Sequence, residues 1–405
     1  MSDKTFFVAR VATYLFMVGA LSVGVWCAYP LVVEERAEVA TVVLSAPLAL
    51  YSSTIIQNSI ELAFEEVRYR VGDMHIQLVV VDDGDESGAW IANKERRNAE
   101  RAIADPTTIA YLGPVNSGAA KVSMPLLNTA GIAQISPSNT WPGLTRTGFL
   151  PGEPGIFYPT GKTHYFRVTP TDDLQGPLGV TWARALGHES VYVVNDSDAY
   201  GIGIANLFEH EAVQQGMHVV GSAAITKDAA LFAPVGDAIL ASGADLVYYG
   251  GTTPNGGPEL LRYLRARGAT STFMGPDGIF EQDFIDRAGT SSEGVLVTAV
   301  GVPPEEVKNP SAQAFLLAYR ARFGSEPDAF GAFAYDATKA LLAAIEKVGK
   351  VDRAGILEAV RATSAMPGVF GTWGFDAHGD TTLTLLSGNV ITEGAFVFTK
   401  VLTAI

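Results

Sequence analysis

Short β-rich runs alternate with longer amphipathic segments along this chain, and this alternation leaves few folds open to it. In the first part, runs at residues 39–44 and 76–81 flank the segment 55–70, whose apolar residues recur at helical spacing. The pattern repeats later, with strand-like runs at residues 191–194, 219–225 and 246–249 and helical segments between them. Such alternation indicates βαβ units and a parallel sheet. The sequence therefore predicts an α/β protein with two lobes, each a mostly parallel sheet flanked by helices.

Two apolar runs, at residues 245–251 and 273–278, each stop on Gly or Pro, as parallel strands do at their carboxyl ends. Ligands of open α/β sheets bind in the crevice beyond those ends. The second run delivers one carboxylate, that of Asp277, to this crevice. A carboxylate in a Pro-Asp-Gly turn can also be no more than a turn former.

Two other strand ends supply hydroxyl groups. Ser117 follows the strand-like run at residues 108–112 and opens a helix, and Thr140 follows the next short strand. A helix start binds anions because its N–H groups are free and it carries partial positive charge. Each hydroxyl could instead cap a helix. Together with Asp277 they would match a zwitterion, with the carboxylate of an amino acid at Ser117 and Thr140 and its ammonium at Asp277.

Charge and motifs argue against several other functions. The net charge of −15 disfavours nucleic acid and anionic membrane surfaces as partners. The single cysteine, Cys27, excludes an intrachain disulfide and a cysteine-based zinc site, and the six histidines form no metal-binding pair. Glycines 155 and 161 with Lys162 resemble a P-loop, but five residues separate them where the motif has four. We therefore expect a binding protein without metal or cofactor, not an enzyme.

The N-terminal region contains a segment able to span a membrane. Residues 11–33 carry no charge, and as a helix these 23 residues would extend over roughly 34 Å. Lys4 and Arg10 precede the segment and acidic residues follow it, so the positive-inside rule places the rest of the protein outside the cytoplasm. A cleaved signal peptide would export the same mass. Because no small-x-small cleavage site appears, we predict an uncleaved anchor.

The order and spacing of further motifs resemble the leucine/isoleucine/valine-binding proteins, the extracytoplasmic receptors of branched-chain amino acid ABC transporters. The resemblance covers residues 39–399. It is carried by the runs at residues 46–51, 82–83, 136–140, 173–177, 200–201, 247–251, 273–278 and 293–298.

This resemblance implies a type I periplasmic-binding fold, in which two α/β lobes joined by three crossings close over the ligand like a clamp. The implied partition is a stub and anchor at residues 1–36, a first lobe at 37–169 with 300–366, and a second lobe at 170–299 with 367–405. The Gly- and Pro-rich stretch 145–162 is longer than the resemblance leads us to expect and falls near the cleft. Trp141, beside Thr140, is expected to intrude on the side-chain pocket.

The resemblance also assigns roles to individual residues. It places the ligand carboxylate at Ser117 with Ser138 and Thr140, and the ammonium at Asp277, where the family often has Glu. It implies pocket-wall positions for Tyr51, Tyr200 and Tyr249, although each tyrosine could simply pack in the core.

We accordingly expect an extracytoplasmic solute-binding protein, held at the membrane by its N-terminal helix. It would capture a branched-chain or related amino acid and deliver it to an ABC permease. The alternative is a ligand-sensing receptor domain of the same fold that binds an amide, urea or a small organic acid.

Overall fold

The computed structural model describes residues 38–228, 230 and 232–403. The predicted membrane segment at residues 11–33 lies outside these ranges and stays a prediction. Within them, no helix combines the length and the apolar character needed to cross a bilayer.

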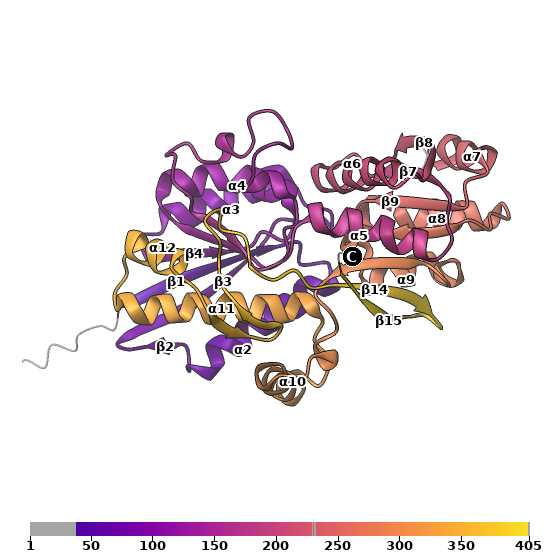
Figure 1. Cartoon of the computed structure of the whole chain (residues 1–405). Helices are drawn as coiled ribbons and strands as arrows, with labels where there is room; N and C mark the ends of the chain where they lie inside the picture. The colour runs from indigo at the N-terminus through magenta and orange to yellow at the C-terminus, as the bar shows by residue number, and fades with distance from the viewer. Residues whose placement is uncertain (1–37, 229, 231, 404–405) are drawn as a thin grey trace, which may run out of the picture. The chain divides into compact units, whose positions relative to one another are not determined.

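The first of two large sheets gathers the strands nearest the N-terminus (Figure 1). In spatial order they are β2 (Arg70–Val71), β3 (Met74–Asp82), β1 (Val39–Ala46), β4 (Thr108–Leu112), β5 (Ala133–Ser136) and β6 (Tyr165–Arg167). All neighbours are parallel except β2 and β3. The strand-like runs expected at residues 39–44 and 76–81 are thus confirmed as β1 and β3.

Helices cover both faces of this sheet, and together they form the first lobe. On one face α11 (Ala329–Val348) packs against both α2 (Tyr51–Glu66) and α12 (Arg353–Arg361), and α10 (Pro310–Phe323) contacts α2. On the other face α3 (Ala92–Ala104) packs against α4 (Ser117–Ala130). Strand β1 shows why both faces are apolar. Val42 and Leu44 join one core cluster with Ile56 of α2, whereas Val43 joins another with Ala99 of α3, because successive side chains of a strand point to opposite faces.

Helix α2 differs from the expected 55–70 segment at both ends. It begins at Tyr51 and ends at Glu66. Arg68 and Tyr69 follow it with φ angles of 55° and 52°, in the left-handed region that an α-helix cannot use. The apolar periodicity continued past the point where the backbone turns into β2.

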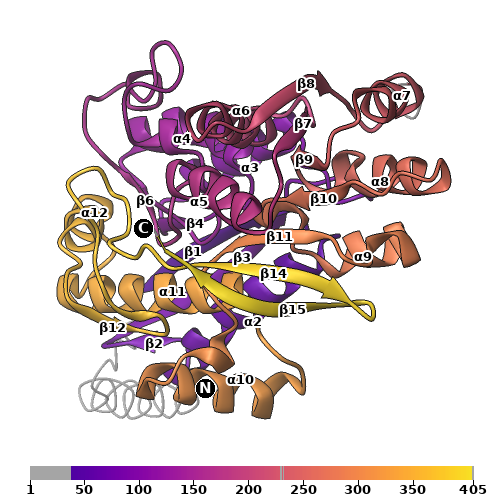
Figure 2. The same cartoon turned by 45° about the vertical axis from the view of Figure 1, so that its right-hand side comes forward.

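The second sheet lies beyond the first in sequence. Its order is β15 (Ala395–Leu402), β14 (Leu386–Thr392), β11 (Leu296–Val300), β10 (Thr272–Gly275), β9 (Leu246–Gly250), β7 (Ser190–Asn195) and β8 (His218–Ala224). Strands β7 to β11 run parallel, and β14 and β15 continue the sheet in antiparallel fashion beside β11 (Figure 2). The runs predicted at residues 191–194, 219–225 and 246–249 are confirmed as β7, β8 and β9.

The second lobe is completed by five helices. They are α5 (Asp172–Ala185) and α6 (Ala199–Gln214) on one face and α7 (Phe232–Ser242), α8 (Gly257–Ala266) and α9 (Gln282–Ala288) on the other. Tyr248 packs with Phe208 of α6, and the adjacent Tyr249 packs with Leu260 of α8. The mostly parallel α/β architecture in two lobes is therefore as predicted.

The chain passes between the lobes from β6 to α5, from β11 to α10, and again before β14. The lobe boundaries expected at residues 170, 300 and 367 stay a prediction. After residue 367 the chain still contacts the first lobe, since Val369 donates its N–H to Asp336 of α11 and Asp380 pairs with Arg167 of β6. We therefore propose that the third crossing lies between Asp380 and Leu386.

Candidate functional site

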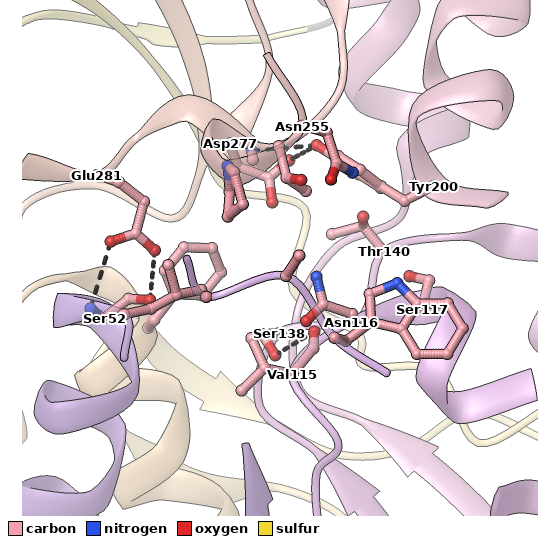
Figure 3. A pocket seen from close by; sticks show the side chains of 18 of the residues that line it. Ser52, Val115, Asn116, Ser117, Ser138, Thr140, Tyr200, Asn255, Asp277 and Glu281 are labelled. Carbon is pink, nitrogen blue, oxygen red and sulfur yellow. Dashed lines mark hydrogen bonds between the residues drawn. The ribbon is translucent and has the colours of Figure 1, made fainter. Parts of the chain in front are cut away.

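A cavity of about 60 Å³ lies where the two lobes face each other (Figure 3). A water needs roughly 10–15 Å³ of such space, so there is room for several groups of that size, the range of a small solute. From the first lobe its walls include Ser52, Trp90, Asn116, Ser117, Ser138 and Thr140, and from the second Tyr200, Asn255, Asp277 and Glu281. The described lining residues carry two carboxyl groups and no Lys, Arg or His side chain.

The first lobe presents hydroxyl groups and a helix start. Ser117 is the first residue of α4, and its Oγ accepts a hydrogen bond of 3.3 Å from the backbone N–H of Trp141, which leaves its proton available. The Oγ1 of Thr140 and the Oδ1 of Asn116 are buried without a partner among the described residues. Ser138 lines the cavity too, although its hydroxyl donates to the carbonyl of Val115 at 2.9 Å. The free N–H groups of α4 and these hydroxyls suit an anion.

The second lobe presents a carboxylate. Asp277 follows β10 in a short 3₁₀ turn and is buried. Tyr200 of α6 donates its hydroxyl to Oδ1 of Asp277 at 2.7 Å and accepts the N–H of Gly278. Burial raises the pKa of Asp277 to about 6 in spite of the Tyr200 bond. A cation in the cavity would pair with this group and favour its charged form.

A second buried carboxyl group, Asp172, stands next to this site. It is the first residue of α5, fully buried, and neither of its oxygens has a partner among the described residues. Burial raises its pKa well above the ordinary value, and the negative charge of Asp277 raises it further. Sequence reasoning missed Asp172, because an acid in the first turn of a helix is so common that nothing set it apart from Asp173.

Three polar contacts join the lobes around the cavity. The indole Nε1 of Trp90 donates to Oδ2 of Asp198 at 2.6 Å, and Lys227 pairs with Asp85 at 2.8 Å. On another side, both the backbone N–H and the hydroxyl of Ser52 donate to the carboxyl group of Glu281. The cleft is therefore closed in this structure.

Five of the seven sequence-predicted site residues come together at this cavity: Ser117, Ser138, Thr140, Tyr200 and Asp277. The other two do not line it. Tyr51 opens α2 with its side chain half exposed, and Tyr249 is buried in the second lobe, where its hydroxyl donates to the carbonyl of Thr252.

Trp141 also lies outside the cavity lining, contrary to expectation. It is buried in a cluster with Met124 and Phe157, and its Nε1 donates to Glu153, within the Gly- and Pro-rich stretch, at 2.8 Å. Lys121 of α4 pairs with the same carboxylate. The stretch therefore holds Trp141 away from the ligand space.

Four residues of the cavity lining carry no local sequence signal that marks a site: Trp90, Asn255, Ser52 and Glu281. Each lies in a loop or a first helical turn, and their proximity depends on how the two lobes face each other.

Within the described ranges, no cluster of three or more His, Cys, Asp or Glu side chains is arranged to hold a metal ion.

A family comparison shows what kind of protein carries this cavity. A family model described as periplasmic binding protein matches residues 40–385. The chain belongs to this family. The two-sheet fold of this periplasmic binding protein is that of the type I class, with mostly parallel sheets flanked by helices, as the sequence predicted.

Curated relatives and solved structures are consistent with this placement. An amino acid binding protein of Pseudomonas aeruginosa is 29% identical over 75% of this chain and 76% of its own. A Leu/Ile/Val-binding protein of Rhizobium johnstonii, BraC3, is 28% identical over 84% of this chain and 87% of its own. The crystal structure of a leucine binding protein, LivK, from Thermotoga maritima superposes with a TM-score of 0.79 at 26% identity, covering 90% and 98% of the two chains. The resemblance to leucine/isoleucine/valine-binding proteins is thus confirmed, and the named relatives are binding proteins.

Proposed function

We propose that this periplasmic binding protein captures an α-amino acid between its lobes and presents it to an ABC permease. The observation that carries the proposal is the opposed chemistry of the cavity walls. The buried carboxylate of Asp277 on one lobe faces the start of α4 on the other, together with the hydroxyl of Thr140, which has no partner among the described residues. An ammonium and a carboxylate on one small molecule would satisfy both walls at once.

The relatives support the same ligand class. Those named above bear names that refer to amino acids, leucine or Leu/Ile/Val. We extend to this chain the ligand class of branched-chain or related amino acids, the delivery to a permease, and a place of action outside the cytoplasm. Ser117, Ser138 and Thr140 would hold the carboxylate, and Asp277, assisted by Tyr200 and Asp172, would hold the ammonium.

Removing the Asp277 carboxylate tests this assignment. In Asp277→Ala the ligand ammonium would be buried without its partner, at a cost of several kcal/mol. At about 1.4 kcal/mol per tenfold, affinity should fall at least a hundredfold. Ser117→Ala and Thr140→Ala should cost less, because the N–H groups of α4 remain. Calorimetric titration with the amino acid that most raises the melting temperature measures all three.

Asp286→Ala provides the matched control, since it removes an exposed carboxylate one turn into α9 without touching the cavity. Its affinity should equal that of the wild type. Binding by Asp277→Ala within threefold of the wild type would remove the ammonium assignment and turn the search towards uncharged solutes.

A further inference from the structure

Glu281 lies at the end of the cavity opposite the proposed carboxylate site. In Figure 3, Ser117 and Thr140 lie on one side, Glu281 and Ser52 on the other, and Asp277 between them. A ligand whose carboxylate and ammonium occupy the first two positions would direct its side chain towards the third.

Glu281 is an unusual group for the end of a side-chain pocket. Only 8% of its surface is exposed, and Leu50, Ile56 and Phe330 share the wall of the cavity with it. Its hydrogen-bond donors in the described structure are the N–H and the hydroxyl of Ser52. Burial raises the pKa of Glu281 to about 8.

A zwitterion alone leaves this carboxyl group without compensation. The ligand ammonium pairs with Asp277 and the ligand carboxylate with the start of α4, so neither reaches Glu281, and Ser52 remains its hydrogen-bond donor among the described lining residues. An aliphatic side chain pressed against Glu281 would remove water from it without replacing the lost hydrogen bonds. A side chain that ends in N–H groups would replace them.

We propose that Glu281 determines side-chain specificity and that the ligand is an amino acid whose side chain ends in an N–H donor, an amide or an ammonium. The inference rests on the proposed function, because it takes the amino-acid orientation as given. It places the ligand among polar or basic amino acids, apart from the aliphatic ones named for several relatives.

The Ser52–Glu281 contact could serve instead only as a latch between the lobes. The two roles lead to different expectations. A latch strengthens binding of every ligand by the same factor, because it favours closure and not a particular side chain. A specificity residue changes the ratio between ligands of equal size.

Isosteric pairs measure that ratio. Leucine and asparagine have side chains of nearly the same shape, as do norleucine and ornithine, and only the second member of each pair ends in N–H groups. Dissociation constants are determined by calorimetry for the wild type and for Glu281→Met, Glu281→Gln and Ser52→Ala, after thermal unfolding shows that each variant is folded.

In the wild type we expect the donor-tipped member of at least one pair to bind tenfold tighter or better than its isostere. Glu281→Met should abolish or reverse that preference, whereas Ser52→Ala should weaken both members alike and keep it. Glu281→Gln distinguishes an amide from an ammonium at the end of the ligand side chain. The variant should keep its affinity for a ligand with an amide and lose its affinity for a ligand with an ammonium.

Two results would overturn the proposal while leaving amino-acid binding intact. One is tighter binding of leucine and norleucine than of their partners by the wild type. The other is an equal loss for both members of a pair in Glu281→Met, which would make the contact a latch. If no amino acid binds the wild type at all, the proposed function itself fails.

Discussion

Asp277 and Glu281 are buried acidic side chains that line one cavity, Asp172 is buried beside it, and the described lining residues offer them no basic partner. Burial raises the pKa of all three, to about 6 for Asp277 and about 8 for Glu281. A group whose pKa is higher in the folded than in the unfolded state stabilises the fold fully only below its unfolded pKa, and this contribution is lost as the pH rises through its folded pKa. Without ligand, the protein should therefore lose stability from about pH 4.5 to pH 8.

Glu281→Gln should reduce this pH dependence. The amide cannot ionise, so the part of the loss due to Glu281 disappears; at about 1.4 kcal/mol per pKa unit that part amounts to several kcal/mol. Urea unfolding at pH 5, 6.5 and 8 gives the slopes for the wild type and the variant. Asp336→Asn is the control. Burial raises the pKa of Asp336 to about 8 as well, but this carboxyl group lies away from the cavity, where it accepts the N–H of Val369. A saturating ligand should change the contribution of Glu281 to the pH dependence of the unfolding free energy and leave the contribution of Asp336 unchanged. Equal pH dependence in the wild type and in Glu281→Gln would show that Glu281 does not titrate as expected.

At the scale of elements, a buried ion pair ties the end of the first sheet to a late part of the chain. Arg167 of β6 is fully buried and its Nε lies 2.7 Å from Oδ1 of Asp380. Arg146, at the start of the Gly- and Pro-rich stretch, places its Nε 2.6 Å from Oδ2 of Asp380. The hydroxyl of Thr145 donates to Oδ1 of Asp380 at 2.8 Å. Burial alone would raise the pKa of Asp380, but the two arginines outweigh it and the pKa is lowered.

Asp380→Asn should destabilise the protein strongly. It leaves the Arg167 guanidinium buried without a counter-charge, and breaking a buried pair in this way costs about 3–5 kcal/mol. Chemical unfolding measures the change. Asp237→Asn removes one partner of the exposed Arg267 pair and should have little effect. Similar stability of the two variants would show that water reaches Arg167.

Prediction from the sequence selected residues that line the cavity where the signal was local. Strand ends on Gly or Pro located Asp277, and a strand followed by a helix start located Ser117. Tyr249 does not line the cavity. Successive side chains of a strand point to opposite faces, and Tyr249 lies on the face of β9 that packs against α8, whereas Tyr248 faces α6. Glu281 and Ser52 were beyond reach, since 229 positions separate them and only the meeting of the lobes joins them.

At the scale of the whole described molecule, close contacts show how tightly the lobes fit. A Cβ atom at Gly203 of α6 would overlap the ring of Trp141 from the first lobe, and one at Gly118 of α4 would overlap Trp90 and Asp198. The lobes meet through these glycines in addition to the polar contacts around the cavity. Such a fit belongs to a closed state, and we predict an open state in which these contacts are broken and which closes on ligand.

Small-angle scattering should therefore show a smaller radius of gyration with ligand than without. Gly203→Leu should prevent this change and weaken binding at least tenfold, because the added side chain occupies the space of the Trp141 ring in the closed state. Asn206→Leu, at an exposed position of the same helix, should close like the wild type. A profile that ligand leaves unchanged in the wild type would contradict the clamp.

The route of the chain through the first lobe also sets when that lobe can form. The strands of its sheet end at Arg167, yet α11 and α12, which complete one of its faces, end only at Arg361. A ribosome adding about 5–20 residues per second needs on the order of ten to forty seconds to make the part between them. During that time the core cluster of Val42 and Leu44 of β1 contains α2 but lacks the side chains that α11 and α12 contribute to it. We therefore expect the lobe that begins synthesis first to be among the last parts to fold, and its nascent strands to stay accessible to chaperones until then.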